Sequence, residues 1–319
     1  MASKTLALVL LFQLLVNTGA FASLGSSQGA RHATQLQSYL ESLGQPGAVA
    51  SFAPPAPAAA APVANGNVAP ASPFPYVPLS DFAVSNLESK GPRATADWGT
   101  PADATAKLGN YGCLSGGTWF CTEGGWPSPN EKAHTEVFYV LSGFGSLDDA
   151  DGARHYFGPG DTVIIPKGHT GRWDVNQAIH KVWAVNAHEQ IEDKSPIIRV
   201  QVDHYNSFAS ELLSPVENGY DPLYGTTAPV TGSVAPSAKT FYNVGPTQVG
   251  VWSSRERGSF AVQSGKASWI YILEGVAYIT MGRESRRCVA GDSVLLPAGW
   301  SGHVDVVEPV KKLWTTAAV

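Results

Sequence analysis

Three side chains near the middle of the sequence could together hold a metal ion. His134 and Glu136 are two residues apart, and His169 follows in the segment PKGHTG. Side chains two residues apart on a β-strand point to the same face, so His134 and Glu136 would lie together. Two imidazoles and a carboxylate suit Zn²⁺, Mn²⁺ or Fe²⁺ with open positions for water or substrate. The alternative is that His134 lies at a rim and His169 fills an aromatic position.

The segments that carry these residues are predicted to be β-strands. Short runs of β-branched and aromatic residues, such as EVFYVLSG (136–143) and HKVWAV (180–185), are separated by Gly, Pro, Asp and Asn. From about Pro92 onward the sequence shows no long 3.6-residue period of the kind that predicts helices. The pattern therefore predicts an all-β fold, either a barrel or a sandwich.

The β pattern occurs twice. Four pairs of segments match in the same order: GTW (117–119) with GVW (250–252), EVFYVLSG with SWIYILEG (268–275), GDTVIIPKGHTGRW (160–173) with GDSVLLPAGWSGHV (291–304), and HKVWAV with KKLWTT (311–316). The spacing between partners is nearly constant, at about 130 residues. Repetition in the same order at one spacing indicates two copies of a single β-domain.

The segments EVFYVLSG and GDTVIIPKG resemble the two motifs of the cupin family, so the chain as a whole resembles a bicupin. The GxW before the first motif, the PxGxxGxW in the second and the closing (H/K)K(V/L)W resemble the subgroup typified by the cupin domain of (S)-ureidoglycine aminohydrolase. The resemblance covers about two thirds of the chain and implies two tandem jelly-roll β-barrels. Gly143 and Gly160 are expected at turns that need a permissive backbone.

Most cupins hold a metal through two histidines and a glutamate of the first motif and a histidine of the second. The resemblance places that glutamate at Glu136. The histidine positions fall at about Asn130, at Lys132 and at Gly171, and none of the three is a histidine. The first copy therefore keeps one of the four family ligands.

The second copy keeps none of these ligands. Its corresponding positions hold Ser268, Ser264 or its neighbours, and Gly302, so the resemblance implies no metal there. In the first copy one divalent metal, Mn, Fe or Zn, would depend on His134 and His169 replacing the missing histidines around Glu136.

A second interpretation of the first copy needs no metal. The predicted ligand-binding residues are Trp119, Phe138, Arg172, Trp173 and Lys181. The three aromatic side chains are expected to point inward with Glu136 and to form a pocket for a small organic ligand bearing an amine, an amide or several hydroxyls. Burial would raise the pKa of Glu136 and make it the catalytic acid or base. The alternative is that the aromatic residues are simply core.

The N-terminal residues are predicted to target the protein. Residues 1–22 contain the apolar run TLALVLLFQLLV followed by small residues, as in a secretory signal peptide. Residues 23–90 are interpreted as a transit-like, Pro/Ala-rich disordered linker. We expect entry into the secretory pathway. The destination is either the plastid of an alga with secondary plastids or an extracellular or endomembrane compartment.

The remaining residues divide into a first cupin domain at 91–195, a connector at 196–240 and a second cupin domain at 241–319. The net charge of −5 and the lack of a Lys/Arg cluster that alternates with aromatic residues argue against nucleic acid as a partner. No membrane span is expected once the signal is removed. The second copy would support the fold or form the face of a homodimer.

Two classes of function remain open. One is an enzyme, either similar to (S)-ureidoglycine aminohydrolase, which releases ammonia with a bound Mn²⁺, or another cupin metalloenzyme, with Glu136 as the catalytic residue. The other is a non-catalytic bicupin that binds a small ligand or has a structural role. Fold alone does not decide between them, because one fold hosts many functions.

Overall fold

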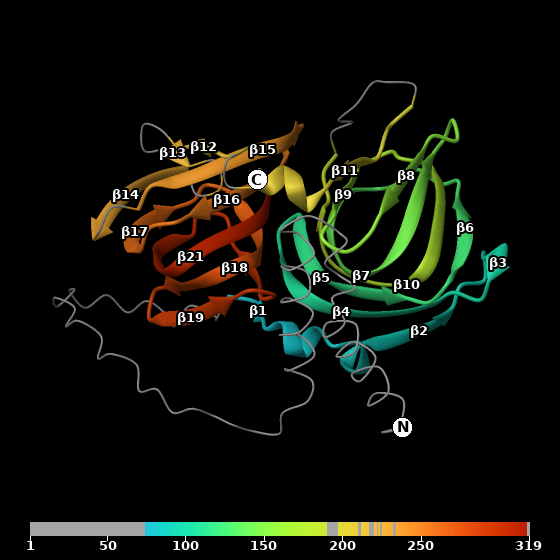
Figure 1. Cartoon of the computed structure of the whole chain (residues 1–319), viewed down its shortest axis with the longest axis horizontal. Coiled ribbons are helices and arrows are strands. Elements are labelled where there is room, and N and C mark those ends of the chain that lie inside the picture. Colours follow the sequence, from blue (N-terminus) through green and yellow to red (C-terminus); the bar gives the residue numbers. More distant parts are fainter. Residues whose placement is uncertain are drawn as a thin grey trace, which may run out of the picture. The chain divides into compact units, whose positions relative to one another are not determined.

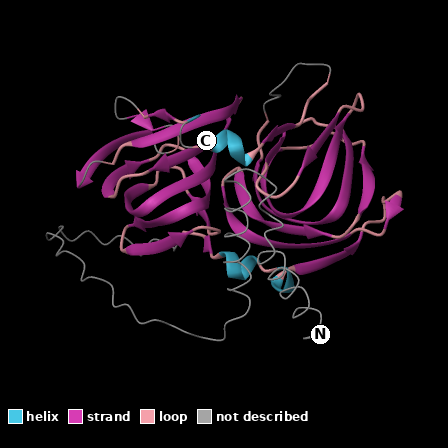
Figure 2. Ribbon diagram, in the orientation of Figure 1, coloured by secondary structure: helices cyan, strands magenta, loops and turns pink. Residues whose placement is uncertain are grey.

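The computed structural model describes residues 74–189, 197–209, 212–216, 220–221, 223, 225–231 and 234–317. These residues fall in one compact unit that spans Val68–Val319. Strands make up nearly all of their regular structure, and the helices among them are short 3-10 turns at Leu79–Phe82, Val84–Asn86 and Tyr205–Phe208 (Figure 2). In this part of the chain no helix combines the length and the apolar composition that crossing a membrane requires. The expected all-β fold is confirmed.

The first barrel is built from one antiparallel sheet (Figure 1). Its ten strands in the described residues are β2 (Glu88–Pro92), β3 (Trp98–Gly99), β4 (Ala102–Tyr111), β5 (Leu114–Cys121), β6 (Gly124–Ser128), β7 (Thr135–Asp149), β8 (Arg154–Phe157), β9 (Thr162–Ile165), β10 (Gly171–Asn186) and β11 (Gln201–Asp203). The strand order is β11-β9-β7-β10-β5-β4-β2, with β6 on β10 and β8 on β7. The long strands β7 and β10 lie side by side at its centre.

The second barrel repeats this arrangement. Its eleven described strands are β1 (Tyr76–Val77), β12 (Ser214–Pro215), β13 (Tyr220–Asp221), β14 (Gly225–Thr231), β15 (Pro236–Val244), β16 (Thr247–Ser254), β17 (Gly258–Gln263), β18 (Ala267–Met281), β19 (Glu284–Val289), β20 (Ser293–Leu296) and β21 (Ser301–Ala317). The order β20-β18-β21-β16-β15 reproduces β9-β7-β10-β5-β4. The predicted duplication is confirmed.

The sequence predicts Gly143 at a turn, but in the structure it lies inside β7. It has a φ of 86°, and the register of β7 against β10 shifts around it. A Cβ atom at Gly143 would lie 2.1 Å from the carbonyl oxygen of Ala178 on the bulged strand. Gly275 takes the same place in the second barrel, 1.8 Å from the carbonyl oxygen of Pro309. Both glycines are therefore needed for a close backbone approach beside a β-bulge.

Ordered structure begins earlier than Pro92. Phe74 is buried in the core of the second barrel, and Tyr76 pairs with Val294 of β20. The Tyr76 hydroxyl donates a hydrogen bond of 2.9 Å to the carboxylate of Asp292. The predicted linker at 23–90 therefore needs a correction in its last part, because a few aromatic residues within a Pro-rich segment supply enough apolar surface to anchor it.

The remaining N-terminal predictions, the signal peptide at 1–22 and the linker as far as residue 73, lie outside the described residues. The connector predicted at 196–240 also differs from expectation. It contributes β11 to the first sheet and β12, β13 and β14 to the second, and β15 begins within it. The connector is thus part of both barrels.

The two barrels share a hydrophobic core. Besides a separate cluster in each barrel, a third cluster joins buried residues of β5, β7, β9 and β10 with residues of β16, β18, β20 and β21. Within it, the rings of Tyr139 and Tyr271 lie 5.2 Å apart, and Trp269 stacks on Tyr271 at 6.2 Å. This shared burial predicts that the two barrels unfold together.

Replacing Trp269 tests this shared core. Trp269 is fully buried, so Trp269→Ala should lower the free energy of unfolding by about 3–5 kcal/mol. Urea unfolding followed by circular dichroism should show one transition at lower urea. Tyr156→Ala, at a residue 55% exposed, is the control and should change stability by less than about 0.5 kcal/mol. Two separate transitions in the wild type would contradict a shared core.

Candidate functional site

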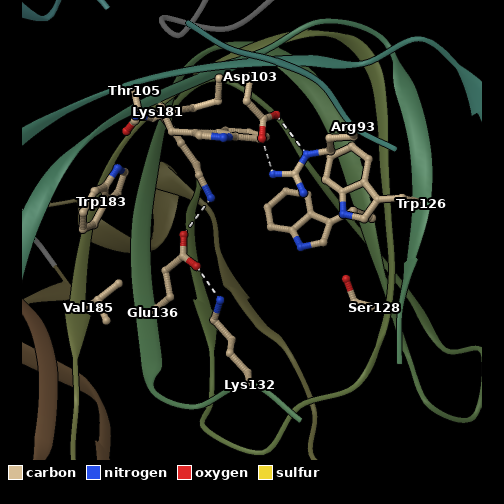
Figure 3. A pocket seen from close by; sticks show the side chains of 13 residues that line it. Arg93, Asp103, Thr105, Trp126, Ser128, Lys132, Glu136, Lys181, Trp183 and Val185 are labelled. Atoms are coloured by element: carbon tan, nitrogen blue, oxygen red, sulfur yellow. Dashed lines mark hydrogen bonds and ion pairs between the residues drawn. The ribbon is translucent and has the colours of Figure 1, made fainter. Parts of the chain in front are cut away.

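A cavity of about 410 Å³ opens inside the first barrel. Its wall carries four tryptophans (Trp119, Trp126, Trp173, Trp183), four cationic side chains (Lys90, Arg93, Lys132, Lys181) and two carboxylates (Asp103, Glu136). Figure 3 shows Glu136 between two lysines on one side of the cavity, with Arg93, Trp126 and Ser128 across from them. The volume is in the range of pockets that hold a small metabolite.

Both carboxylate oxygens of Glu136 accept hydrogen bonds from lysines. Lys132 Nζ donates to Oε2 at 2.6 Å, and Lys181 Nζ donates to Oε1 at 2.8 Å. The side chains of Glu136 and Lys181 are 13% and 5% exposed. The group Lys132, Glu136 and Lys181, which we call the ion triad, places two positive charges on one buried carboxylate.

Local backbone structure fixes both lysines. The backbone N–H of Lys132 donates to the carbonyl oxygen of His169 at 3.1 Å, and Gly168 N donates to the carbonyl oxygen of Lys132 at 2.7 Å. The turn of the PKGHTG segment therefore holds Lys132 in place. Lys181 lies in β10 opposite Trp119 of β5 and Val140 of β7, so strand register alone directs its side chain into the barrel.

Aromatic rings surround the ammonium group of Lys181. Its Nζ atom lies 3.8 Å from the ring centre of Phe138, 4.6 Å from that of Trp173 and 4.7 Å from that of Trp119. The negative face of an aromatic ring attracts a cation, most strongly away from water. The rings therefore compensate Lys181 for part of the hydration that it loses on burial.

A column of stacked planar groups continues from these rings toward the rest of the cavity wall. Phe138 stacks on Trp173 at 5.8 Å, and Trp173 stacks on Trp126 at 6.0 Å. The Arg93 guanidinium lies 4.1 Å from the ring centre of Trp126 and pairs with Asp103, with Nε 2.9 Å from Oδ1. Trp173, Trp126 and Arg93 line the cavity, whereas Phe138, which was also predicted to bind ligand, is fully buried and does not line it.

Burial and the charges of the triad together set the pKa values of Glu136 and Lys181. Burial alone raises the pKa of Glu136, but Lys132 and Lys181 together hold it well below its usual range. Burial lowers the pKa of Lys181, and the attraction of Glu136 offsets this only in part. The expected upward shift for Glu136 is therefore wrong, because the sequence did not show that two ammonium groups would contact it. Glu136 is an ionised carboxylate at neutral pH.

The described residues do not fit the metal site considered from the sequence. His134 lies in the bend just before β7 and does not line the cavity. His169 is buried with its Nε2 atom 3.1 Å from the carboxylate of Asp149, which His155 also contacts at 2.7 Å. Within the ranges that the structure describes, no three His, Cys, Asp or Glu side chains are arranged to hold a metal ion. Ammonium groups occupy the acceptor atoms of Glu136 instead.

Arg172, also predicted to bind ligand, does not line the cavity. Its guanidinium pairs with Asp97 at 2.6 and 2.7 Å and with Asp174 at 2.9 Å, which ties the segment before β3 to β10. The arginine of the cavity is Arg93, which lies before the repeated segments and has no counterpart that could have signalled its role. Lys132 could have been identified as a site residue from the sequence, since it occupies a position where the family usually has a metal-binding histidine.

The second barrel keeps the backbone of this site and a lysine at the position of Lys181, but it has neither Lys132 nor Glu136. Ser264 takes the place of Lys132, because its N–H donates to Trp300 O at 2.8 Å and its carbonyl accepts from Gly299 at 2.8 Å. Lys312 is the counterpart of Lys181, fully buried with Nζ 4.1 Å from the ring centre of Trp252. Its burial lowers its pKa to about 7, and Asp221 of the connector opposes that shift.

The comparisons agree with this architecture. The sequence model of the EutQ-like cupin domain matches residues 108–183 and again 243–314. No curated protein matches the sequence. The (S)-ureidoglycine aminohydrolase subgroup therefore remains a prediction from the motifs.

Solved structures with similar folds have low sequence identity to this chain. A putative glyoxylate-induced protein from Pseudomonas aeruginosa has a TM-score of 0.54 at 15% identity, covering 81% of this chain and 93% of that one. A protein of unknown function from Pseudomonas syringae pv. tomato, of the DUF861 family, scores 0.52 at 14% identity, with coverages of 74% and 94%. A cupin 2 conserved barrel domain protein from Leptotrichia buccalis scores 0.51 at 11% identity, with coverages of 79% and 98%. At these identities the similarity concerns the fold.

Removing the carboxylate tests the ion triad. Glu136→Gln leaves Lys181 buried without its counter-charge and should lower the free energy of unfolding by about 3–5 kcal/mol. Because folding lowers the pKa of Glu136, its contribution is present above about pH 4.3 and is lost as the pH falls further. Urea unfolding at several pH values measures both effects.

The matched control for that variant is the double variant Glu136→Gln with Lys181→Met, which removes both charges. It should be less destabilised than the sum of the two single variants, since each single variant leaves one charge of the Glu136–Lys181 pair without its partner and the double variant leaves neither charge. Additive effects of the two substitutions would contradict the ion triad.

Proposed function

Because this chain is a bicupin, with one EutQ-like cupin domain in each half, we propose that its first barrel binds a small organic anion in a site that needs no metal. The single observation that supports this proposal most directly is the ion triad on the cavity wall. In a metal-binding cupin a cation contacts the glutamate of the first motif. Here Lys132 and Lys181 supply two positive charges to the same carboxylate.

The charge of the cavity wall favours an anionic ligand. Four cationic side chains and two carboxylates line the cavity, and Lys90 is paired with Glu88 outside it, which leaves an excess of one positive charge. Asp103 is paired with Arg93, and Glu136 with both triad lysines. A carboxylate or a similar small anion would balance this excess through charge-assisted hydrogen bonds. The amine, amide or polyol ligand expected from the sequence alone fits the cationic wall less well.

The aromatic wall limits the size and shape of that ligand. Trp119, Trp126, Trp173 and Trp183 all line the cavity, so a compact molecule with one flat or apolar face would pack against them. A small carboxylic acid meets both requirements. The second barrel, which has Ser264 and Ser268 at the positions of Lys132 and Glu136, would support the fold or form a homodimer face.

A metalloenzyme, including one similar to (S)-ureidoglycine aminohydrolase, is less well supported. That function requires imidazole donors beside Glu136. In the described part of the chain, His169 contacts Asp149 instead, and His134 lies outside the cavity.

Binding of small acids can be measured directly. Isothermal titration calorimetry of the full chain with pyruvate, glyoxylate, L-lactate and malonate, in the presence of EDTA, should detect binding of at least one of these acids. The bound acid should also quench the tryptophan fluorescence of the protein. Lys132→Met removes a charged donor and should weaken that binding about tenfold or more. His134→Ala, outside the cavity, is the control and should bind as the wild type does. Binding that appears only after a divalent metal is added would contradict the proposal.

A further inference from the structure

We propose that Lys181 forms a Schiff base with the carbonyl carbon of a small 2-oxo acid bound in the first barrel. This inference rests on the proposed function, since it assigns a reactive group to the same anion-binding cavity. It adds a covalent chemistry and a narrower class of ligand, acids that carry a carbonyl beside the carboxylate.

The position of Lys181 is that of a reactive amine rather than of a surface lysine. Its side chain is 5% exposed, yet it lines the cavity. Aromatic rings lie within 5 Å of its Nζ atom, so little water competes for that atom. Lysines in apolar pockets near a second cationic group are those that proteins use to attack carbonyl carbons. Lys132, bonded to the other oxygen of Glu136, is that second cation.

Glu136 lies where a proton carrier for this chemistry is needed. Its Oε1 atom is 2.8 Å from Lys181 Nζ. Glu136 accepts one proton from the ammonium group as the lysine nitrogen attacks the carbonyl carbon, and a second proton passes from that nitrogen to the former carbonyl oxygen, which becomes the carbinolamine hydroxyl. Glu136 then returns its proton to this hydroxyl, which leaves as water. Overall, the ammonium group and the carbonyl compound give the protonated Schiff base and one water molecule, and no other reactant is consumed.

The rest of the cavity explains why the carbonyl compound would be an acid. Lys132 and Arg93 line the same cavity as Lys181 and provide positive charge for a carboxylate. A 2-oxo acid holds its carbonyl carbon next to that carboxylate. Anchoring the carboxylate would therefore bring the carbonyl carbon toward a lysine on the same wall.

The second barrel provides an internal control. Lys312 occupies the equivalent strand position and is also buried against a tryptophan, but it does not line this cavity. Its ring neighbour Trp252 donates a hydrogen bond to Asp221 of the connector. Burial beside an aromatic ring is common to both lysines, whereas access to a ligand cavity distinguishes Lys181.

Reductive trapping tests the inference. The full chain is incubated with pyruvate and sodium cyanoborohydride, digested, and examined by mass spectrometry for a carboxyethyl adduct on each lysine. We expect the adduct to be concentrated at Lys181 and to decrease when L-lactate, an anion without a carbonyl, is added as a competitor. Lys181→Arg keeps a cation beside Glu136 but has no primary amine, so the main adduct should be lost. Lys312→Arg should leave it unchanged.

The outcomes separate this inference from the proposed function. If calorimetry shows that pyruvate and L-lactate bind but the adducts spread over exposed lysines, Lys181 is not the nucleophile and the anion site stands. If none of the small acids binds, both proposals are overturned. Because the adduct map of the wild type already decides between these results, the test does not depend on the stability of Lys181→Arg.

Discussion

A carboxylate inside a barrel must be neutralised, and in this protein the neutralising charges are two ammonium groups. Transferring an ion from water to a protein interior costs several kcal/mol unless partners replace its hydration. Lys132 and Lys181 supply these partners to Glu136, and aromatic rings in turn surround Lys181. The position of the turn that follows β9, the register of β10 and the arrangement of the tryptophans all serve this one requirement.

The two barrels show how one backbone meets that requirement in different ways. In the first barrel the negative charge that pairs with the buried lysine, Lys181, is carried by Glu136 on β7. The second has Ser268 there, and the negative charge that acts on Lys312 comes from Asp221 of the connector. The connector is therefore part of the second barrel's interior as well as a link between domains. A shared hydrophobic core joins the barrels, so the second can stabilise the first without a ligand site of its own.

The sequence was sufficient for the fold because each of its β motifs occurs twice. Two copies of each motif predicted the strands and the tandem barrels, and strand parity predicted that Trp119, Phe138 and Trp173 point inward with Glu136. Trp119, Trp173 and Glu136 do line the cavity, whereas Phe138 is fully buried. The sequence was not sufficient to predict contacts made by residues outside the repeated motifs. Arg93 precedes the repeat, and nothing in the pattern indicates that it stacks on Trp126.

The errors in the predicted site have physical causes. Alternation along a strand does not apply to His134, which lies before β7 begins, and it cannot place His169, which lies in a turn. The predicted pKa shift of Glu136 has the wrong direction because that direction depends on two lysines that are 4 and 45 residues away along the chain. Gly143 was expected at a turn because a sequence does not distinguish a turn glycine from one that faces a bulge.

The metal content of the purified full chain tests the central claim most directly. After expression in medium supplemented with manganese, iron and zinc, elemental analysis should find far less than one metal ion per chain, and Glu136→Ala should not change that value. One bound metal ion per chain that is lost in both Glu136→Ala and His134→Ala would contradict the account. In that case a metal, rather than two lysines, would be the partner of the Glu136 carboxylate.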